Sequence, residues 1–249
     1  MKELYPDFFA RFYDLIYHKI RDATDHQYFM DNIRQTNGKI LEIGTGTGRF
    51  FIDALSKGAD IYGIDISTAM TDVLKSKLDS QQHYRISDGN MVNFESDLRF
   101  DLIIAPFRVM MHISEKEDQL KAINNVRKHL NPGGKFIFDV FVPDLNYLIK
   151  GFDNHVDFDE EYAPGKRVRR IVTTTPDLIN QIINVEFRFE WDEDSGKENA
   201  SWKTPMRFFF RFELEHLIER SDFKNYSIHG DYLESKLKRT SKEFVVCCW

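Results

Sequence analysis

The segment with the clearest chemical potential is Leu41-Glu42-Ile43-Gly44-Thr45-Gly46-Thr47-Gly48-Arg49, in which three glycines occupy alternate positions. Lys39-Ile40-Leu41 predicts a short buried strand before the glycines, and residues 50–55 predict the start of a helix after them. Glycines let the backbone approach a ligand closely, and a helix start presents unpaired N–H groups and a positive dipole end. The segment therefore predicts a nucleotide-binding turn.

The spacing of the glycines separates two kinds of nucleotide site. The dinucleotide fingerprint Gly-x-Gly-x-x-Gly fails here, because its third glycine would fall on Arg49. The spacing is instead Gly-x-Gly-x-Gly, with an acid, Glu42, two residues before the first glycine. A second predicted strand, Ile61-Tyr62-Gly63-Ile64-Asp65, ends in another acid. We expect Asp65 to hold a ribose, and the register disfavours a nicotinamide cofactor.

The pattern acid-x-Gly-x-Gly-x-Gly resembles the first motif of the class I S-adenosylmethionine-dependent methyltransferases. The resemblance covers about residues 40–142. Gly89-Asn90-Met91-Val92-Asn93-Phe94 is similar to the family's third motif, and Leu130-Asn131-Pro132-Gly133-Gly134-Lys135 resembles the turn before its fifth strand. The resemblance implies S-adenosyl-L-methionine as the cofactor and S-adenosyl-L-homocysteine as the product. It also implies an α/β fold with a Rossmann-like doubly wound sheet of seven strands, the last one antiparallel.

The third motif departs from the family at the residue expected to contact adenine. Counting back from Phe94, the family's acid falls on Asn90, and the nearest carboxylate, Asp88, lies two residues earlier. An Asn carbonyl can still accept a hydrogen bond from the adenine amino group, so both residues stay candidates. The resemblance implies cofactor-binding roles for Tyr17, Glu42, Gly44, Thr45, Gly46, Gly48, Arg49, Asp65, Ile66, Asp88, Asn90, Met91, Ala105 and Pro106.

Two kinds of side chain are candidates for the chemistry. The loop after the predicted strand Phe100-Asp101-Leu102-Ile103-Ile104-Ala105 contains His112, and the carboxyl ends of such strands are where open α/β sheets place their ligands. His112 is the candidate general base if the acceptor arrives protonated; the alternative is a capping or packing histidine. The order Tyr5…Phe8-Phe9-Ala10…Tyr13-Asp14…Tyr17 is similar to the N-terminal cap of small-molecule methyltransferases. That similarity implies that Tyr13 or Tyr17 positions the sulfonium end of the cofactor; the alternative is an aromatic stripe packed on the core.

Substrate-binding residues carry no motif of their own. Arg108 and Arg207 are candidates, because a guanidinium can bind an acidic group bidentately, although surface arginines are common. Phe141, at the end of the predicted fifth strand, is a third candidate.

The hydrophobic pattern divides the chain into three units. Residues 1–34 repeat aromatic and aliphatic residues at helical spacing and predict a cap of two helices. Residues 35–142 and 206–249 are expected to form the S-adenosylmethionine-binding domain. Residues 143–205 are rich in aromatic and β-branched residues and predict an inserted small antiparallel sheet. Such an insertion is similar to that of the small-molecule and sugar N-methyltransferases, where it roofs the substrate cleft; a dimer interface is the alternative.

Several boundaries can be predicted from local signals. Ser67 is expected to cap a helix that runs toward Leu78, and Ser114-Glu115-Lys116-Glu117 is expected to form a capping box for a helix to Leu130. Further strands are expected at residues 84–87, 136–140, 168–175, 179–191, 206–212, 226–229 and 244–249, and a helix at 213–220.

Composition limits the remaining possibilities. The chain has 249 residues, 42% of them hydrophobic, and a formal net charge of −6, which argues against a broad nucleic-acid footprint. No long apolar run indicates a signal peptide or a membrane span, so a cytoplasmic monomer or homodimer is expected. The adjacent Cys247 and Cys248 lack ligand-spaced partners, and no metal site is expected.

Two functions from different classes remain. One is a methyltransferase acting on a nitrogen or oxygen nucleophile of a small soluble molecule. The other is a non-catalytic cofactor-binding or regulatory protein that keeps the methyltransferase fold.

Overall fold

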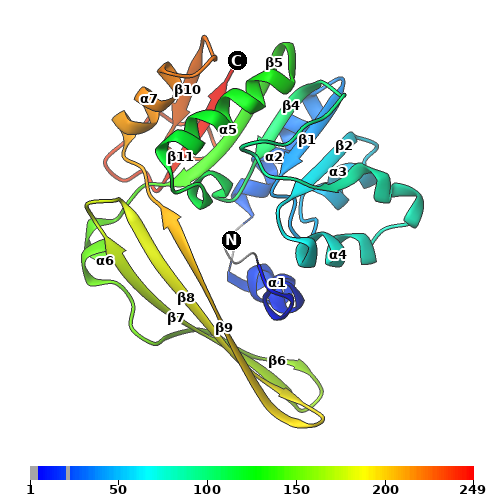
Figure 1. The fold of residues 1–249 in the computed structure, drawn as a ribbon, viewed down its shortest axis with the longest axis vertical. Coiled ribbons are helices and arrows are strands. Elements are labelled where there is room, and N and C mark those ends of the chain that lie inside the picture. Colours follow the sequence, from blue (N-terminus) through cyan, green and yellow to red (C-terminus); the bar gives the residue numbers. More distant parts are fainter. Residues whose placement is uncertain (1–4, 21–22) are drawn as a thin grey trace.

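The computed structural model describes residues 5–20 and 23–249, and its larger sheet has seven strands (Figure 1). Their order is β10-β11-β5-β4-β1-β2-β3, and β11 runs antiparallel to both of its neighbours while the other pairs are parallel. The predicted fold class is therefore confirmed. The strands are β1 Lys39–Ile43, β2 Asp60–Asp65, β3 Ile86–Asp88, β4 Phe100–Ala105, β5 Leu130–Phe141, β10 Tyr226–His229 and β11 Glu243–Cys248.

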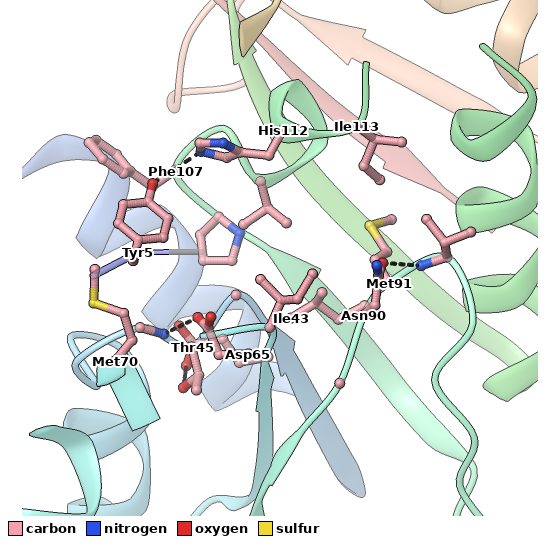
Figure 2. A pocket seen from close by; sticks show the side chains of 18 of the residues that line it. Tyr5, Ile43, Thr45, Asp65, Met70, Asn90, Met91, Phe107, His112 and Ile113 are labelled. Atoms are coloured by element: carbon pink, nitrogen blue, oxygen red, sulfur yellow. Dashed lines mark hydrogen bonds between the residues drawn. The ribbon is translucent and has the colours of Figure 1, made fainter. Parts of the chain in front are cut away.

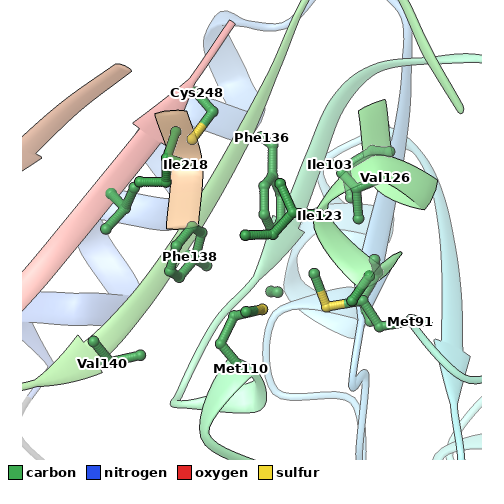
Figure 3. Packing of buried hydrophobic residues seen from close by; sticks show 14 of the residues in the cluster. Met91, Ile103, Met110, Ile123, Val126, Phe136, Phe138, Val140, Ile218 and Cys248 are labelled. Atoms are coloured by element: carbon green, nitrogen blue, oxygen red, sulfur yellow. The ribbon is translucent and has the colours of Figure 1, made fainter. Parts of the chain in front are cut away.

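Helices cover both faces of this sheet, which explains its nearly continuous apolar central strands. Successive side chains of a strand point to opposite faces, so Ile103 of β4 packs with Ile123 of α5 while the next residue, Ile104, packs with Phe29 of α2. Figure 3 shows the first of these layers, in which Ile218 of α7 also lies. The helices of this domain are α2 Thr24–Gln35, α3 Phe51–Ser56, α4 Thr68–Ser76, α5 Lys116–His129 and α7 Arg211–Glu219, while α6 Leu145–Lys150 follows β5 and lies beside the inserted sheet (Figure 1).

A second sheet of four antiparallel strands is inserted between β5 and α7. Its strands are β6 His155–Ala163, β7 Lys166–Asp177, β8 Ile182–Glu193 and β9 Gly196–Arg207. One face of this sheet lies against α1, Asp7–Ile20 (Figure 1). Phe9 and Phe12 of α1 pack with Phe189 and Trp202 of the sheet, and Met70 of α4 belongs to the same cluster. Helix α1 thus connects the inserted sheet to the larger domain.

Parts of the insertion differ from the prediction. Strand β6 was not predicted, because its run of acidic residues resembles a polar loop more than a strand. The expected strand at 206–212 is also wrong. Strand β9 begins at Gly196 and pairs with β8 up to Arg207, after which Phe208 is buried in the larger core. The sheet therefore ends where the chain returns to the main domain.

The predicted helix caps have different outcomes. Ser67 caps α4 as expected, since its Oγ accepts the N–H of Met70 at 3.4 Å. The capping box at Ser114 is wrong, because α5 begins at Lys116 after Glu115, which makes no side-chain cap. Instead Gln119 Nε2 donates to the carbonyl of Ile113 at 2.8 Å.

The two predicted N-terminal helices are observed as α1 and α2, apart from residues 1–4 and 21–22, which lie outside the described residues. Within the described part of the chain, no helix combines the length and apolar character needed to cross a membrane.

Candidate active site

A cavity of about 320 Å³ lies at the carboxyl ends of β1, β2 and β4 (Figure 2). The strand order reverses between β4 and β1, and such a switch point is where open α/β sheets bind ligands. The volume is within the range of small-molecule sites. The lining residues are Tyr5, Tyr13, Glu42, Ile43, Gly44, Thr45, Gly46, Thr47, Arg49, Phe50, Asp65, Ile66, Met70, Gly89, Asn90, Met91, Val92, Pro106, Phe107, Val109, His112, Ile113, Ser114, Glu115 and Asp118.

The three glycines of the turn have different roles although all have positive φ, at 71°, 55° and 96°. A Cβ on Gly44 would lie 2.5 Å from Val109 Cγ2, and one on Gly48 would lie 2.3 Å from Leu74 Cδ1. A Cβ on Gly46 would meet no atom outside its immediate neighbours closer than 3.9 Å. Gly44 and Gly48 therefore allow close packing of the fold, while Gly46 leaves backbone exposed to the cavity.

Two buried carboxyl groups flank this turn. Asp65 Oδ2 accepts the N–H of Gly46 and Oδ1 accepts the N–H of Ser67, both at 2.8 Å. Burial raises the pKa of Asp65, and the backbone hydrogen bonds only partly oppose that shift. Glu42 is 1% exposed, accepts a hydrogen bond from Thr45 Oγ1 at 3.3 Å, and has its pKa raised well above the usual glutamate value by burial. A ligand that offers hydrogen-bond donors or positive charge would stabilise both carboxylates.

Helix α1 is attached to the glycine turn by polar contacts that the sequence did not predict. Thr47 Oγ1 donates to Asp14 Oδ1 at 2.6 Å, and Lys77 Nζ contacts both Asp14 Oδ2, at 2.5 Å, and the Thr47 carbonyl, at 2.8 Å. No local signal predicted that Asp14 and Lys77 would meet here, because polar residues on helix faces are usually solvated. The attachment fixes the helix that carries Tyr13 above the cavity.

His112 lies at the end of a short 3-10 helix, Val109–His112, and lines the cavity. Its Nε2 is 3.2 Å from the hydroxyl oxygen of Tyr5 (Figure 2). The Tyr5 ring also contacts Trp202 of the inserted sheet, with ring centroids 4.4 Å apart. Three distant segments therefore meet at the predicted base.

The two candidate tyrosines occupy different positions. Tyr13 lines the cavity, whereas Tyr17 does not. The Tyr17 ring packs on the rings of Tyr13 and Phe107, with centroids 4.4 Å and 5.5 Å apart. The Arg170 guanidinium lies 5.0 Å from the centroid of the Tyr17 ring. Tyr17 supports the residues that line the cavity.

At the opposite end of the cavity, Asn90 lies among the lining residues together with Met91 and Ile66, and Asp88 does not. Asn90 Oδ1 accepts the N–H of Val92 at 2.9 Å (Figure 2). Asp88 Oδ1 instead lies 3.4 Å from Thr71 Oγ1. Of the two candidates for the adenine contact, Asn90 is the one at the cavity.

Neither predicted substrate arginine lies in the cavity. Arg108 pairs with Glu243 at 3.3 Å, and its guanidinium lies 5.2 Å from the Phe141 ring, which is also outside the lining. Arg207 is buried, pairs with Glu213 and donates to the carbonyl of Asn180 at 3.0 Å. The guanidinium of the buried Arg207 needs acceptors and finds them inside the protein, while that of the half-buried Arg108 is paired with Glu243.

Three predicted cofactor residues have mainly structural surroundings. Ala105 is completely buried in the core beneath the cavity, and Gly48 packs on α4; neither lines the cavity. Arg49 does line it, but its Nη1 donates to Asp25 Oδ2 at 2.6 Å and so ties α2 to the glycine turn.

Two further acids, Asp139 and Glu243, lie near the loop after β4. Asp139 is 1% exposed, and burial raises its pKa to about 6, opposed by Arg108 and by the N–H of Phe107. Burial also raises the pKa of Glu243 to about 7, although Arg108 opposes the shift. The folded protein therefore binds protons more tightly at these groups than the unfolded chain does.

Replacing Asp139 with asparagine should make stability less sensitive to pH. A carboxyl group whose pKa is raised in the folded state stabilises the fold below its unfolded pKa of about 4, and that contribution is lost as pH rises through 6. The free energy of unfolding of the variant should therefore rise relative to wild type by about 2 kcal/mol between pH 4.5 and pH 8. Urea unfolding measures this difference. The exposed Asp153→Asn is the control, and a difference independent of pH would contradict the assignment.

Comparison with known proteins bears out the resemblance seen in the sequence. Residues 40–134 match a family model described as a methyltransferase domain. An uncharacterized methyltransferase of Bacillus mycoides is 32% identical over 108 residues, which are 43% of this chain and 49% of that protein. The chain thus spans about half the length of the curated relatives it matches.

Solved structures share the architecture over nearly the whole chain. An S-adenosylmethionine-dependent methyltransferase from Clostridium acetobutylicum has a TM-score of 0.77 at 18% identity and covers 97% of both chains. An amino pentose methyltransferase from Micromonospora echinaspora, solved with S-adenosylmethionine bound, has a TM-score of 0.69 at 17% identity. That match covers 100% of this chain and 99% of the other. At these sequence identities the likeness shows the fold alone. The covered span of this chain includes the inserted sheet.

Proposed function

We propose that this chain transfers a methyl group from S-adenosyl-L-methionine to a nitrogen or oxygen atom of a small soluble molecule. The observation that carries the proposal is the pair of buried acids, Glu42 and Asp65, beside the glycine turn in a cavity at the switch point of the sheet. The matched methyltransferase domain, residues 40–134, contains all of these residues.

The charge of the cavity favours this cofactor over a dinucleotide. S-Adenosylmethionine offers an ammonium group, a sulfonium and two ribose hydroxyls, all of which suit buried carboxylates. A dinucleotide would bring its anionic pyrophosphate to the glycine turn beside Glu42, where like charges repel, whereas an acid placed as Asp65 is can hold the ribose of either cofactor. Asp65 would hold the ribose and Glu42 the amino acid end, while Asn90, Met91 and Ile66 would contact adenine.

The aromatic end of the cavity is the proposed acceptor site. Tyr5, Tyr13, Phe107 and His112 line it, and Trp202 of the inserted sheet packs on Tyr5. These contacts support a roof function for the sheet.

Slower hydrogen exchange in β9 when an acceptor binds would support the proposal that the inserted sheet roofs the substrate cleft. Protection in β9 that depends on protein concentration would instead indicate an interface between copies of this chain.

The mechanism needs little covalent machinery. When bound, S-adenosylmethionine supplies a methyl group already activated by the positive sulfonium. The protein's residues then orient the acceptor and exclude water, and orientation can contribute about 7–11 kcal/mol. His112 Nε2, which faces the Tyr5 hydroxyl, would take the proton of an acceptor that arrives as an ammonium or a hydroxyl.

Calorimetry with unlabelled ligands tests the cofactor assignment. S-Adenosylmethionine and S-adenosylhomocysteine should bind with micromolar dissociation constants, and NAD should show no binding at the same concentrations. The reason is the glycine register together with the buried acid Glu42 beside the turn. Binding of NAD alone would overturn the proposal.

A further inference from the structure

The loop after β4 begins in an unusual backbone conformation. Phe107 and Arg108 have φ values of 57° and 70°, and they are consecutive residues with side chains. Residues other than glycine adopt such values at a cost, and they persist only where surrounding contacts hold them. The loop continues into Val109 and His112, which line the cavity.

The buried side chain of Asp139 accepts a hydrogen bond from this turn on the side away from the cavity. Asp139, near the end of β5, accepts the Phe107 N–H through Oδ1 at 2.7 Å and the Tyr232 hydroxyl through Oδ2 at 3.2 Å. The residue is 1% exposed and does not line the cavity. Hydrogen bonds to a carboxylate are stronger than those between neutral groups, so Asp139 is well suited to hold a strained peptide.

The rest of the turn fits this arrangement. The Arg108 side chain forms an ion pair with Glu243, and its guanidinium lies 5.5 Å from the centroid of the Phe107 ring. With Arg108 on that side, Val109 lies against Gly44, so closely that a Cβ on Gly44 would be 2.5 Å from Val109 Cγ2. The turn thus fixes one wall of the cavity against the glycine turn.

We propose that Asp139 is a positioning residue for the cofactor cavity, because it holds the Phe107–Arg108 turn and thereby sets Val109 and His112 in place. It acts through the backbone of Phe107 and does not touch the ligand. This inference rests on the proposed function for its ligand, but the geometry of the loop is independent of that function.

Asp139→Leu, which removes the acceptor and keeps a similar size, should weaken S-adenosylhomocysteine binding roughly tenfold or more in the folded protein. Asp139→Asn keeps a carbonyl acceptor for the Phe107 N–H and should bind within about threefold of wild type. Val140→Ala is the matched control. The Val140 side chain is next to Asp139 in sequence and is fully buried on the other face of β5, so this variant should lower Tm and leave the affinity unchanged. Wild-type affinity in Asp139→Leu would overturn the proposal.

Hydrogen exchange without any ligand separates this inference from the proposed function. Exchange in a peptide spanning residues 106–113 should be about tenfold faster in Asp139→Leu than in wild type, and unchanged in Val140→Ala. If wild type fails to bind S-adenosylhomocysteine but the three proteins differ in exchange as expected, the cofactor assignment fails and the positioning role stands. Equal exchange in Asp139→Leu and wild type would overturn the positioning role.

Discussion

Replacing His112 with alanine should lower the rate of methyl transfer by about 10²–10⁴-fold, the range for losing a general base. Affinity for S-adenosylhomocysteine should remain unchanged, because His112 lies at the aromatic end of the cavity beside Tyr5, away from the acids that face the glycine turn. Single-turnover kinetics on the true acceptor, alongside calorimetry, measure the two effects separately.

Two companion variants make this test specific. His216→Ala removes a histidine of α7 whose side chain is 76% exposed and which does not line the cavity, so its rate should match wild type. Tyr5→Phe removes the hydroxyl that contacts His112 and keeps the ring on Trp202, so a smaller loss is expected. A rate of methyl transfer in His112→Ala that falls by less than about threefold would mean that His112 is not a general base and that the protein acts only by aligning the acceptor with the methyl group.

Asp65→Ala should weaken cofactor binding by about 1.5–3 kcal/mol, the range for losing hydrogen bonds to a charged group. Asp65 is 7% exposed and lines the cavity, and it also accepts the N–H of Gly46 at 2.8 Å. Its removal therefore takes away the proposed ribose ligand and a support of the glycine turn. Calorimetry with S-adenosylhomocysteine measures the loss.

The control for Asp65 lies on the adjacent strand. Asp88 of β3 is in register with Asp65, yet it does not line the cavity, so Asp88→Ala should bind as wild type does. An unchanged affinity in folded Asp65→Ala would mean that Asp65 is not the ribose ligand. A large loss in Asp88→Ala would return the adenine contact to that residue.

Local signals predicted the part of the site that follows directly from chain order. The glycine turn lies between β1 and α3, Asp65 ends β2, and Ser67 caps α4. Each of these features depends on a few neighbouring residues, and parallel strands bring their carboxyl ends to one edge of the sheet. The cofactor end of the cavity could therefore be predicted from the sequence.

Residues whose role depends on distant partners were not predictable in the same way. Arg108 and Arg207 were candidates for an acidic substrate, but Glu243 and Glu213 bind them inside the fold. Nothing local distinguishes a guanidinium that will find an internal acceptor from one that will not. Asp139 was missed for the same reason, since its partner, the N–H of Phe107, lies 32 residues earlier in the chain.

The inserted sheet shows the limit of hydrophobic patterning. Strands β7 and β8 are rich in aromatic and β-branched residues and were expected, whereas β6 is an edge strand with several acids. Charged side chains are common on edge strands, where they discourage pairing with other chains. The same residues hide such a strand in the sequence.

The most direct test of the proposed function is turnover of methyl-labelled S-adenosylmethionine with a panel of small amine and hydroxyl acceptors. We expect label to appear in one class of acceptor, with S-adenosylhomocysteine released in equal amount, and both signals to fall together in His112→Ala. Tight cofactor binding without release of S-adenosylhomocysteine across the panel would contradict the enzyme and favour a binding or regulatory protein that keeps the fold.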